Sequence, residues 1–582
     1  MHWNLKLLYK DLNDPQIERD IKASESIVKT FVKKWKGNKE YLKDPKILKK
    51  ALGEYEYLFS KYGILIKPYY YTLLNKEIDL NNNEIKAVLN KLEHRIIKLE
   101  NDLQFFEISL SKVPTGKEKE FINSPILKEY KHYLEMLFAN AKYVLSNKEE
   151  GVFNITSKSS FSNWVNMVEE LLSKQNLTIL DEDLKKKEVS YNEVSKYLSS
   201  TNKKVRDRTA QEFNKVNKKY IEIAEYEMNS VLESKQASDE YRGVKRPDLP
   251  RHISTDVDTE IVDTLVDVVT NNFDISKNFY KEKAKLLDQK SIGYHERNVP
   301  IGKIDKEFEF EEGLDIVQRV FNNIDTEFGD ILTSFIKNKQ IDAFPKANKS
   351  GGAYCISVNK NLPTYILLNY NKKVNDVLTI AHECGHGIHS ELVKEQNSLN
   401  TDYSLALAEV ASTFFEDFAL EEIINNTNDK DFIESLQHES MDQTISTIFR
   451  QVAFYNFEKE LHGIFREKGY LSHEEISNIF VKHMQSYLGD AVDVDDSMRY
   501  GWIYVSHFRN FFYVYTYASG LLISKYLQNR VREDKEFVNK FKDFLKAGSS
   551  KSVKDIFLDM EIDISKREFW EDGVVNLKNS FK

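Results

Sequence analysis

Apolar residues recur every three or four positions along most of this chain, the spacing that places them on one face of an α-helix. The pattern is clear at residues 27–35 and 96–106, and Pro15 and Pro125 stand where helices are expected to begin. Charged residues fill most of the positions between. The pattern therefore predicts that residues 1–190 form an N-terminal lobe of successive amphipathic helices.

Two short segments depart from this helical pattern. Residues 350–358 and 365–370 are apolar runs, and residues 359–363 separate them. We expect both runs to be β-strands, because short apolar runs flanked by Gly, Asn and Pro are typical of strands. Most of the remaining chain keeps the helical spacing, so residues 191–582 are predicted to form a second lobe that contains a small β-sheet.

Chain length and composition support the same fold class. A chain of 582 residues is too long for one hydrophobic core, so at least two lobes are expected. Only 21 Gly and 10 Pro are present, which disfavours β-sandwiches, barrels and disordered tails. The fold is therefore predicted to be mostly α.

Net charge and cysteine content limit the possible binding partners and the expected cellular compartment. The formal net charge of −9 is mild for this length, so neither nucleic acid nor an anionic membrane is expected as a partner. The least polar stretch is too short to span a bilayer, and the N-terminus lacks a signal-peptide pattern. The chain has only Cys355 and Cys384, which fits a reducing compartment, and the cytoplasm is the expected location.

The most informative segment is His382-Glu383-Cys384-Gly385-His386. On a helix, His382 and His386 lie one turn apart on the same face, so both imidazoles can bind one zinc ion. Glu383 lies beside them and can act as general base on a zinc-bound water. The alternative is a pair of surface or core histidines. The helix is expected to be buried, because an apolar stripe runs beside the histidines: Val374, Leu378, Ala381, Gly385, Ile388 and Leu392.

A zinc site needs a third protein ligand. His389 is seven residues from His382, roughly 10 Å along a helix, and cannot share the same ion. The helix expected at residues 405–416 carries Glu409 among apolar neighbours. We predict that Glu409 completes a His-His-Glu site for one zinc ion per chain and that Glu416 hydrogen-bonds to a ligand. The alternative for Glu409 is an exposed helix glutamate.

Through these residues the chain resembles the thimet oligopeptidase and oligoendopeptidase F family of zinc metallopeptidases, and it looks closest to the oligoendopeptidase F branch. The resemblance is centred on residues 379–390 and 409–416 and extends over nearly the whole chain. Further matching segments are Trp3-Asn4-Leu5 with Leu8-Tyr9, Tyr241-Arg242-Gly243, Gly351-Gly352-Ala353-Tyr354, Tyr365 to Asn369, His507-Phe508 and Phe512 to Gly520.

The resemblance implies a two-lobed, mostly helical zincin-type fold with a deep central channel and a small β-sheet next to the histidine helix. It places the catalytic centre in the lobe formed by residues 191–582. It also implies that short unstructured peptides are cut in the cytoplasm, because a narrow channel excludes folded proteins. No residue preference around the cut follows from it.

The resemblance further implies that His507 and nearby tyrosines face the substrate carbonyl. If residues 511–524 are helical, which we favour, Tyr513 and Tyr517 share a face on which a phenol can bind a developing oxyanion. If the segment is extended, Tyr513, Tyr515 and Tyr517 alternate together. A packing role is the alternative for each tyrosine.

These residues predict a zinc-dependent endopeptidase. Glu383 is expected to take a proton from water and pass it to the leaving amine. The backbone of Gly351, Gly352, Ala353 and Tyr354 is expected to pair with the substrate as an added β-strand. One alternative is a helical zinc carboxypeptidase, which would not cut a peptide blocked at both ends. The other is a peptide binder without catalysis, against which the intact Glu383 argues.

Overall fold

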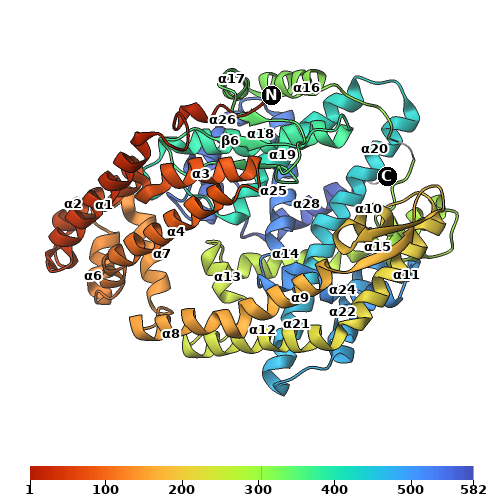
Figure 1. The fold of residues 1–582 in the computed structure, drawn as a ribbon, viewed down its shortest axis with the longest axis horizontal. Helices are drawn as coiled ribbons and strands as arrows, with labels where there is room; N and C mark the ends of the chain where they lie inside the picture. The colour runs from red at the N-terminus through yellow and green to blue at the C-terminus, as the bar shows by residue number, and fades with distance from the viewer. Residues whose placement is uncertain (303, 581–582) are drawn as a thin grey trace. The chain divides into compact units, whose positions relative to one another are not determined.

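Helices dominate the computed structural model, which describes residues 1–302 and 304–580 (Figure 1). Within these residues the strands are short and form sheets of only two or three strands. The predicted mostly α fold is therefore confirmed. The chain folds into two compact units, each assembled from segments that are distant in the sequence. The lobe boundary expected near residue 190 stays a prediction.

Unit 1 comprises residues 1–142, 305–427 and 524–562. Its N-terminal helices are α1 (Pro15–Trp35), α2 (Pro45–Tyr57), α3 (Ile66–Ile78), α4 (Asn83–Leu103), α5 (Phe105–Ser111), α6 (Thr115–Ile122) and α7 (Lys131–Ala141). Its other elements are α16 (Phe310–Ile324), α17 (Thr326–Lys337), β4 (Ile341–Asp342), β5 (Tyr354–Ile356), β6 (Tyr365–Leu367), α18 (Val374–Leu392), α19 (Leu405–Asn425), α26 (Phe537–Ala547) and α27 (Val553–Asp559). Helix α25 (Tyr515–Glu533) contains residues of both units.

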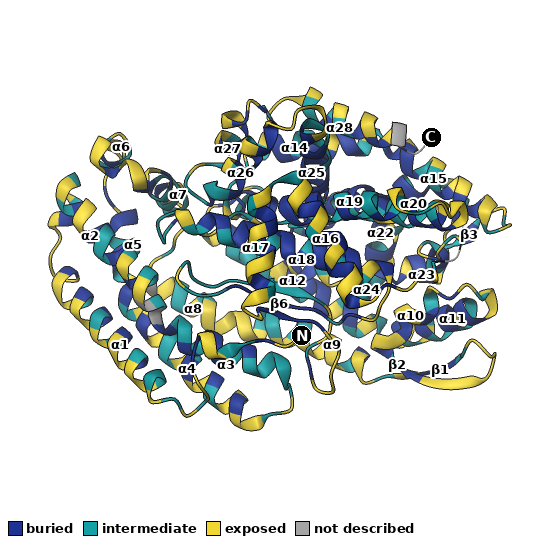
Figure 2. Cartoon of the chain, turned by 90° about the horizontal axis from the view of Figure 1, so that it is seen from above, coloured by how far each residue is buried: buried dark blue, intermediate teal, exposed yellow. Residues whose placement is uncertain are grey.

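The N-terminal helices of unit 1 each bury one stripe, and Figure 2 shows buried and exposed residues alternating along them. Phe31 of α1 and Phe106 of α5 meet edge to face, with ring centroids 5.4 Å apart. Helix α1 begins at Pro15, where the Asp14 side chain accepts the backbone N–H of Gln16. A 3₁₀ helix begins at Pro125. Both predicted helix starts are therefore confirmed.

The small sheet of unit 1 has the strand order β4-β6-β5. Strand β6 pairs parallel to β4 and antiparallel to β5, so β5 is an edge strand. The N-terminal segment packs on this sheet, since Trp3 Nε1 donates to the Ile366 carbonyl at 2.8 Å. Both predicted strands exist but are shorter than predicted. Residues 351–353 precede β5 instead of belonging to it.

Unit 2 comprises residues 143–304, 428–523 and 563–582, of which residue 303 and residues 581–582 lie outside the described part. Its helices are α8 (Asn147–Ser157), α9 (Asn163–Ser173), α10 (Val194–Leu198), α11 (Lys203–Lys219), α12 (Ile221–Tyr241), α13 (Leu249–Ser254), α14 (Thr259–Asn271), α15 (Phe273–Leu286), α20 (Lys430–Ile445), α21 (Gln451–Lys468), α22 (His473–Leu488), α23 (Asp496–Arg499), α24 (Gly501–Tyr504) and α28 (Arg567–Ser580). Its strands are β1 (Asn176–Leu180), β2 (Lys186–Ser190), β3 (Ile292–Gly293) and β7 (Val492–Asp493).

The hairpin of β1 and β2 was not predicted, because residues 1–190 were expected to be helical throughout. The two strands pair antiparallel from Asn176–Ser190 to Leu180–Lys186. Leu177 and Ile179 are buried while their neighbours in β1 face outward. This period of two covers only five residues, and the charged residues of β2 hide it further.

Candidate metal centre

Helices α18 and α19 pack closely in unit 1 and carry the predicted metal ligands. The predicted stripe of α18 is buried, including Ala381 and Ile388 with no exposed surface. Gly385 faces α19 so closely that a Cβ on it would lie 3.0 Å from the Ser412 Cα. Helix α19 begins after Ser404, whose side chain accepts the Ala406 N–H. A small residue at position 385 therefore lets the two helices approach.

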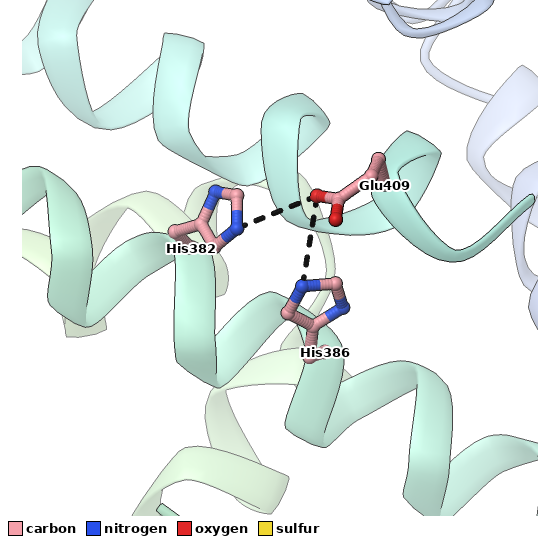
Figure 3. A group of neighbouring side chains, drawn as sticks. All are labelled: His382, His386 and Glu409. Atoms are coloured by element: carbon pink, nitrogen blue, oxygen red, sulfur yellow. Dashed lines mark ion pairs between the residues drawn. The ribbon is translucent and has the colours of Figure 1, made fainter. Parts of the chain in front are cut away.

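The structure brings His382, His386 and Glu409 together (Figure 3). Oε2 of Glu409 lies 3.5 Å from His382 Nε2 and 3.8 Å from His386 Nε2. Atoms about 2 Å from a tetrahedral ion lie roughly 3.3 Å apart, so this spacing suits zinc. The three side chains are 19–31% exposed, which leaves solvent access for a water or substrate at a fourth position. Two imidazoles and a carboxylate thus fit a zinc ion with an open site.

Glu416 orients one of the two histidines. Its Oε2 lies 2.8 Å from His382 Nδ1, so this ring nitrogen donates to the carboxylate and Nε2 is left for the ion. Ser412 Oγ donates to Glu409 Oε2 at 3.1 Å and holds that carboxylate in turn. The predicted hydrogen bond between Glu416 and one of the two histidines is present, and the role of His382 as a metal ligand stays a prediction.

Charges at this centre shift the pKa values of its residues. Burial lowers the pKa of His382, but the carboxylates of Glu416, Glu383 and Glu409 outweigh it and raise the pKa to about 9. Burial and the charge of His382 lower the pKa of His386 to about 4. The carboxylates thus favour a cation at the centre, which is the electrostatic requirement of a metal site.

Glu383 lies on α18 beside the two histidines and is only 7% exposed. Burial raises the pKa of its carboxyl to about 7, although the charge of His382 and the backbone N–H of Cys355 partly oppose this rise. Cys355 belongs to β5, so the sheet edge lies beside Glu383. A carboxyl group with a pKa near neutrality suits proton transfer.

His389 and Cys384 are buried packing residues, while Cys355 is partly exposed. His389 is 1% exposed and stacks on Tyr403 with a centroid distance of 3.7 Å. Cys384 is buried, and burial raises the pKa of both thiols. Tyr403, which was not singled out in the sequence, thereby joins the loop before α19 to the histidine helix.

The expected substrate-binding segment lies in a loop except for one residue. Gly351, Gly352 and Ala353 precede β5, and only Tyr354 is in the strand. Gly352 has a φ of +74°, which a strand residue does not adopt, so the strand predicted over residues 350–358 is wrong at these three positions. Asn369 Nδ2 donates to the Gly352 carbonyl at 2.7 Å and fixes this loop.

His507, Tyr513 and Tyr517 belong to unit 2 and cluster there. Their ring centroids lie 5.4–5.9 Å apart, and the Tyr513 hydroxyl hydrogen-bonds to His507 Nδ1. The favoured helix over 511–524 is wrong at its start, since α25 begins at Tyr515. Phe511 and Tyr513 therefore both precede the helix.

Arg450 acts on this cluster and was missed by the sequence reasoning. Burial and the charge of Arg450 together lower the pKa of His507 to about 4. In the sequence Arg450 is one more charged residue of a helical stretch. Nothing in its spacing distinguishes it from the surface charges around it.

A mostly helical fold in which two histidines and a glutamate converge beside a second glutamate defines a helical metallopeptidase. The model of peptidase family M3 matches residues 164–575, and a model described as oligopeptidase F matches residues 110–175. The chain therefore belongs to peptidase family M3, whose members are metallopeptidases, and is an enzyme that acts on oligopeptides. The family expected from the sequence is confirmed.

Individual relatives match over most of the chain. The oligoendopeptidase F homolog of Borreliella burgdorferi is 24% identical over 98% of this chain and 95% of its own length. Oligopeptidase PepF of Bacillus subtilis is 26% identical over 86% of this chain and 75% of its own length. The crystal structure of oligoendopeptidase-F from Enterococcus faecium covers 97% of this chain and 96% of its own, with a TM-score of 0.69 at 18% identity. This last match supports the shared fold.

None of the helices in the described residues is both long enough and apolar enough to cross a membrane.

Proposed function

We propose that this protein is a zinc-dependent endopeptidase that hydrolyses short unstructured peptides in the cytoplasm. The observation that carries the proposal is the convergence of His382, His386 and Glu409 within 4.8 Å, with Glu383 beside them on α18. These three residues would hold one zinc ion. When bound, the ion would supply Lewis acidity for a water molecule and for the scissile carbonyl. The cytoplasmic location rests on the cysteine content and on the family resemblance.

Glu383 acts as the general base in this proposal. Its carboxylate accepts a proton from the attacking water and then donates it to the nitrogen of the leaving amine. The short distance along α18 between Glu383 and the two histidines supports this role. Among the described strands, β5 lies at the edge of its sheet, where an extended peptide would pair, and the loop formed by Gly351, Gly352 and Ala353 lies directly before it.

His507 and Tyr517 are proposed to donate hydrogen bonds to the oxyanion that develops on the substrate carbonyl, and the Tyr513 hydroxyl is proposed to donate to His507 Nδ1 and hold that ring in place. The hydrogen bond between His507 and Tyr513 supports a shared task for the two side chains. A neutral His507 can donate from its Nε2, because its lowered pKa keeps the ring uncharged at neutral pH.

Replacing Glu383 by Gln tests the proposal. The variant should retain about one zinc ion per chain, and its kcat for a fluorogenic peptide blocked at both ends should fall about 10²–10⁴-fold because the general base is lost. Metal content and peptide cleavage are measured on the same preparation. Glu391→Gln, two turns further along α18, is the matched control and should keep both.

Retained turnover in Glu383→Gln would remove Glu383 as the base. Loss of zinc from the variant would instead indicate a structural role. The blocked peptide also separates the alternatives, since an endopeptidase cuts it and a carboxypeptidase does not. A chelator should abolish the cleavage, and added zinc should restore it.

A further inference from the structure

Arg450 has no acidic partner among the described residues. It ends a π-helical turn (Ser446–Arg450) between α20 and α21, and such turns are frequent at functional sites. Its guanidinium lies over the Phe454 ring at 4.6 Å. Within residues 1–302 and 304–580, Arg450 Nε is buried without a hydrogen-bond partner, and no Asp or Glu forms an ion pair with this residue.

Arg297 is a second arginine without an acidic partner among the described residues, although its side chain hydrogen-bonds to Tyr504. Its Nη1 donates to the Tyr294 carbonyl at 2.8 Å, and the guanidinium lies over the Tyr294 ring at 4.0 Å. Its Nε is also buried without a partner in the described part of the chain. The carboxylate that acts electrostatically on Arg297 is Asp442, which is already bound by Lys283 Nζ.

Both arginines lie near the same tyrosines. Burial raises the pKa of Tyr487 and of Tyr504, and the positive charges of Arg297 and Arg450 oppose the rise in each case. Tyr487 and Tyr294 are fully buried, and their hydroxyl groups have no hydrogen-bond partner among the described residues. Two guanidinium groups and two phenols with unused donors thus gather in unit 2.

This cluster of two guanidinium groups and two buried phenols is poorly stable without a bound anion. Burying a charge without a counter-charge is costly, and an unsatisfied buried donor adds to the cost. Asp442 cannot neutralise both arginines, because it already forms an ion pair with Lys283. As whole residues, Arg297 and Arg450 are of intermediate exposure, although their Nε atoms are buried.

The arginines also adjoin the proposed oxyanion-binding cluster. The Phe454 ring that Arg450 covers lies 6.0 Å from the His507 ring, centroid to centroid. A planar guanidinium binds a carboxylate through two parallel hydrogen bonds, and tyrosine hydroxyls can add further donors. We propose that Arg450 and Arg297 form a subsite for a carboxylate of the peptide substrate, from its C-terminus or from an acidic side chain. This subsite rests on the proposed function and specifies which peptides it favours.

The test measures binding separately from cleavage. Full-length Glu383→Gln protein is titrated by calorimetry with three versions of one short N-acetylated peptide. The first ends in a free carboxylate, the second in an amide, and the third ends in an amide but carries an internal Asp. Mass spectrometry checks that each peptide stays intact. If this variant still cuts them, the proposed function fails, and the chelated wild-type protein reports binding instead.

The expected result is that at least one carboxylate peptide binds about tenfold or more tightly than the neutral amide. The first and third peptides distinguish the C-terminal from the side-chain source. Arg450→Met should erase the preference and leave the affinity for the neutral amide within about twofold. Arg450→Lys keeps the charge but loses the planar guanidinium group, so it should keep part of the preference for the carboxylate peptide.

Arg499→Met is the matched control, because Arg499 lies exposed on α23 of the same unit. It should preserve the preference. Equal affinity of the three peptides for the protein with an intact Arg450 overturns the proposal. This outcome does not require that any arginine variant folds. A preference that survives in both Arg450→Met and Arg297→Met also overturns it.

A second readout follows the His507 ring by NMR in protein labelled at histidine. A carboxylate bound beside Arg450 offsets its charge and should raise the pKa of His507, whereas the neutral amide should not. A purely structural Arg450 would not produce this difference. An identical His507 titration with both peptides would contradict the subsite.

Discussion

Phe511 and Phe512 both adopt left-handed backbone conformations, with φ values of 43° and 57°. Bulky residues rarely do so, because Cβ meets the backbone there. Arg251 Nε donates to the Phe511 carbonyl at 2.9 Å, and Glu458 Oε1 accepts the Phe512 N–H at 3.0 Å. Tyr513 follows directly, so these two contacts determine where its hydroxyl meets His507. Strain of this kind is typical of functional segments.

Glu458 should make the stability of the protein depend on pH. It is fully buried, and burial raises its pKa from 4.5 to about 8. Between these values the unfolded chain is ionised while the folded protein keeps the proton, so stability falls as pH rises. Glu458→Gln removes this contribution, which is at most about 1.4 kcal/mol per pH unit. Urea unfolding at pH 5, 6.5 and 8 should show a shallower decline for the variant.

Glu467→Gln, an exposed position nine residues further along α21, should retain the wild-type pH dependence. If the free energy of unfolding falls with pH equally in wild type and in Glu458→Gln, Glu458 is already ionised in the folded protein. Glutamine can still accept the Phe512 N–H, so the comparison isolates the proton.

At the scale of elements, α18 could be predicted from the sequence because its stripe and its histidines depend only on helical spacing. The position of Glu409 beside the two histidines could be predicted because its apolar neighbours in α19 argued against an exposed helix glutamate. The start of α25 could not, since the periodicity of residues 511–514 is helical. Phe511 and Phe512 are held out of the helix by hydrogen bonds to Arg251 and Glu458, two residues that lie far away in the sequence. Long-range hydrogen bonds of this kind leave no local pattern.

The packing of α18 against α19 should control metal affinity through Gly385. A Cβ at this position would lie 3.0 Å from the Ser412 Cα, 3.0 Å from Phe415 Cδ2 and 3.2 Å from the Ala411 carbonyl oxygen. Because backbone atoms cannot rotate away, Gly385→Ala should displace α19 and Glu409 with it. We expect a loss of about 1–3 kcal/mol of stability and weaker zinc binding, measured by urea unfolding and by competition with a chromogenic chelator.

Gly463→Ala is the control for helix propensity. Gly463 lies within α21, and no described atom would come within 4 Å of an added Cβ. This substitution should raise stability by up to about 1 kcal/mol and leave zinc binding unchanged. Wild-type zinc affinity in Gly385→Ala would show that α19 accommodates the methyl group without moving Glu409.

At the scale of the whole molecule, the two compact units carry different parts of the proposed chemistry. His382, His386, Glu409 and Glu383 all belong to unit 1, while the His507 cluster and Arg450 belong to unit 2. Each unit is built from distant segments, which no local pattern of the sequence reveals. A ligand that binds only the folded state stabilises what it holds together, by about 4 kcal/mol at a concentration 1,000 times its Kd.

Removing the metal should therefore loosen unit 1 selectively. We expect chelation to speed amide hydrogen exchange in α18 and α19 and in α16, which packs on both of them. Exchange in α14, α21 and α22 of unit 2 should stay within error, because none of these helices supplies a ligand. Mass spectrometry of peptic fragments resolves these segments. Glu409→Ala, which lacks one proposed ligand, should already exchange rapidly in α18 and α19 and respond little to the chelator. Equal acceleration in both units would mean that the metal stabilises the molecule as a single cooperative body.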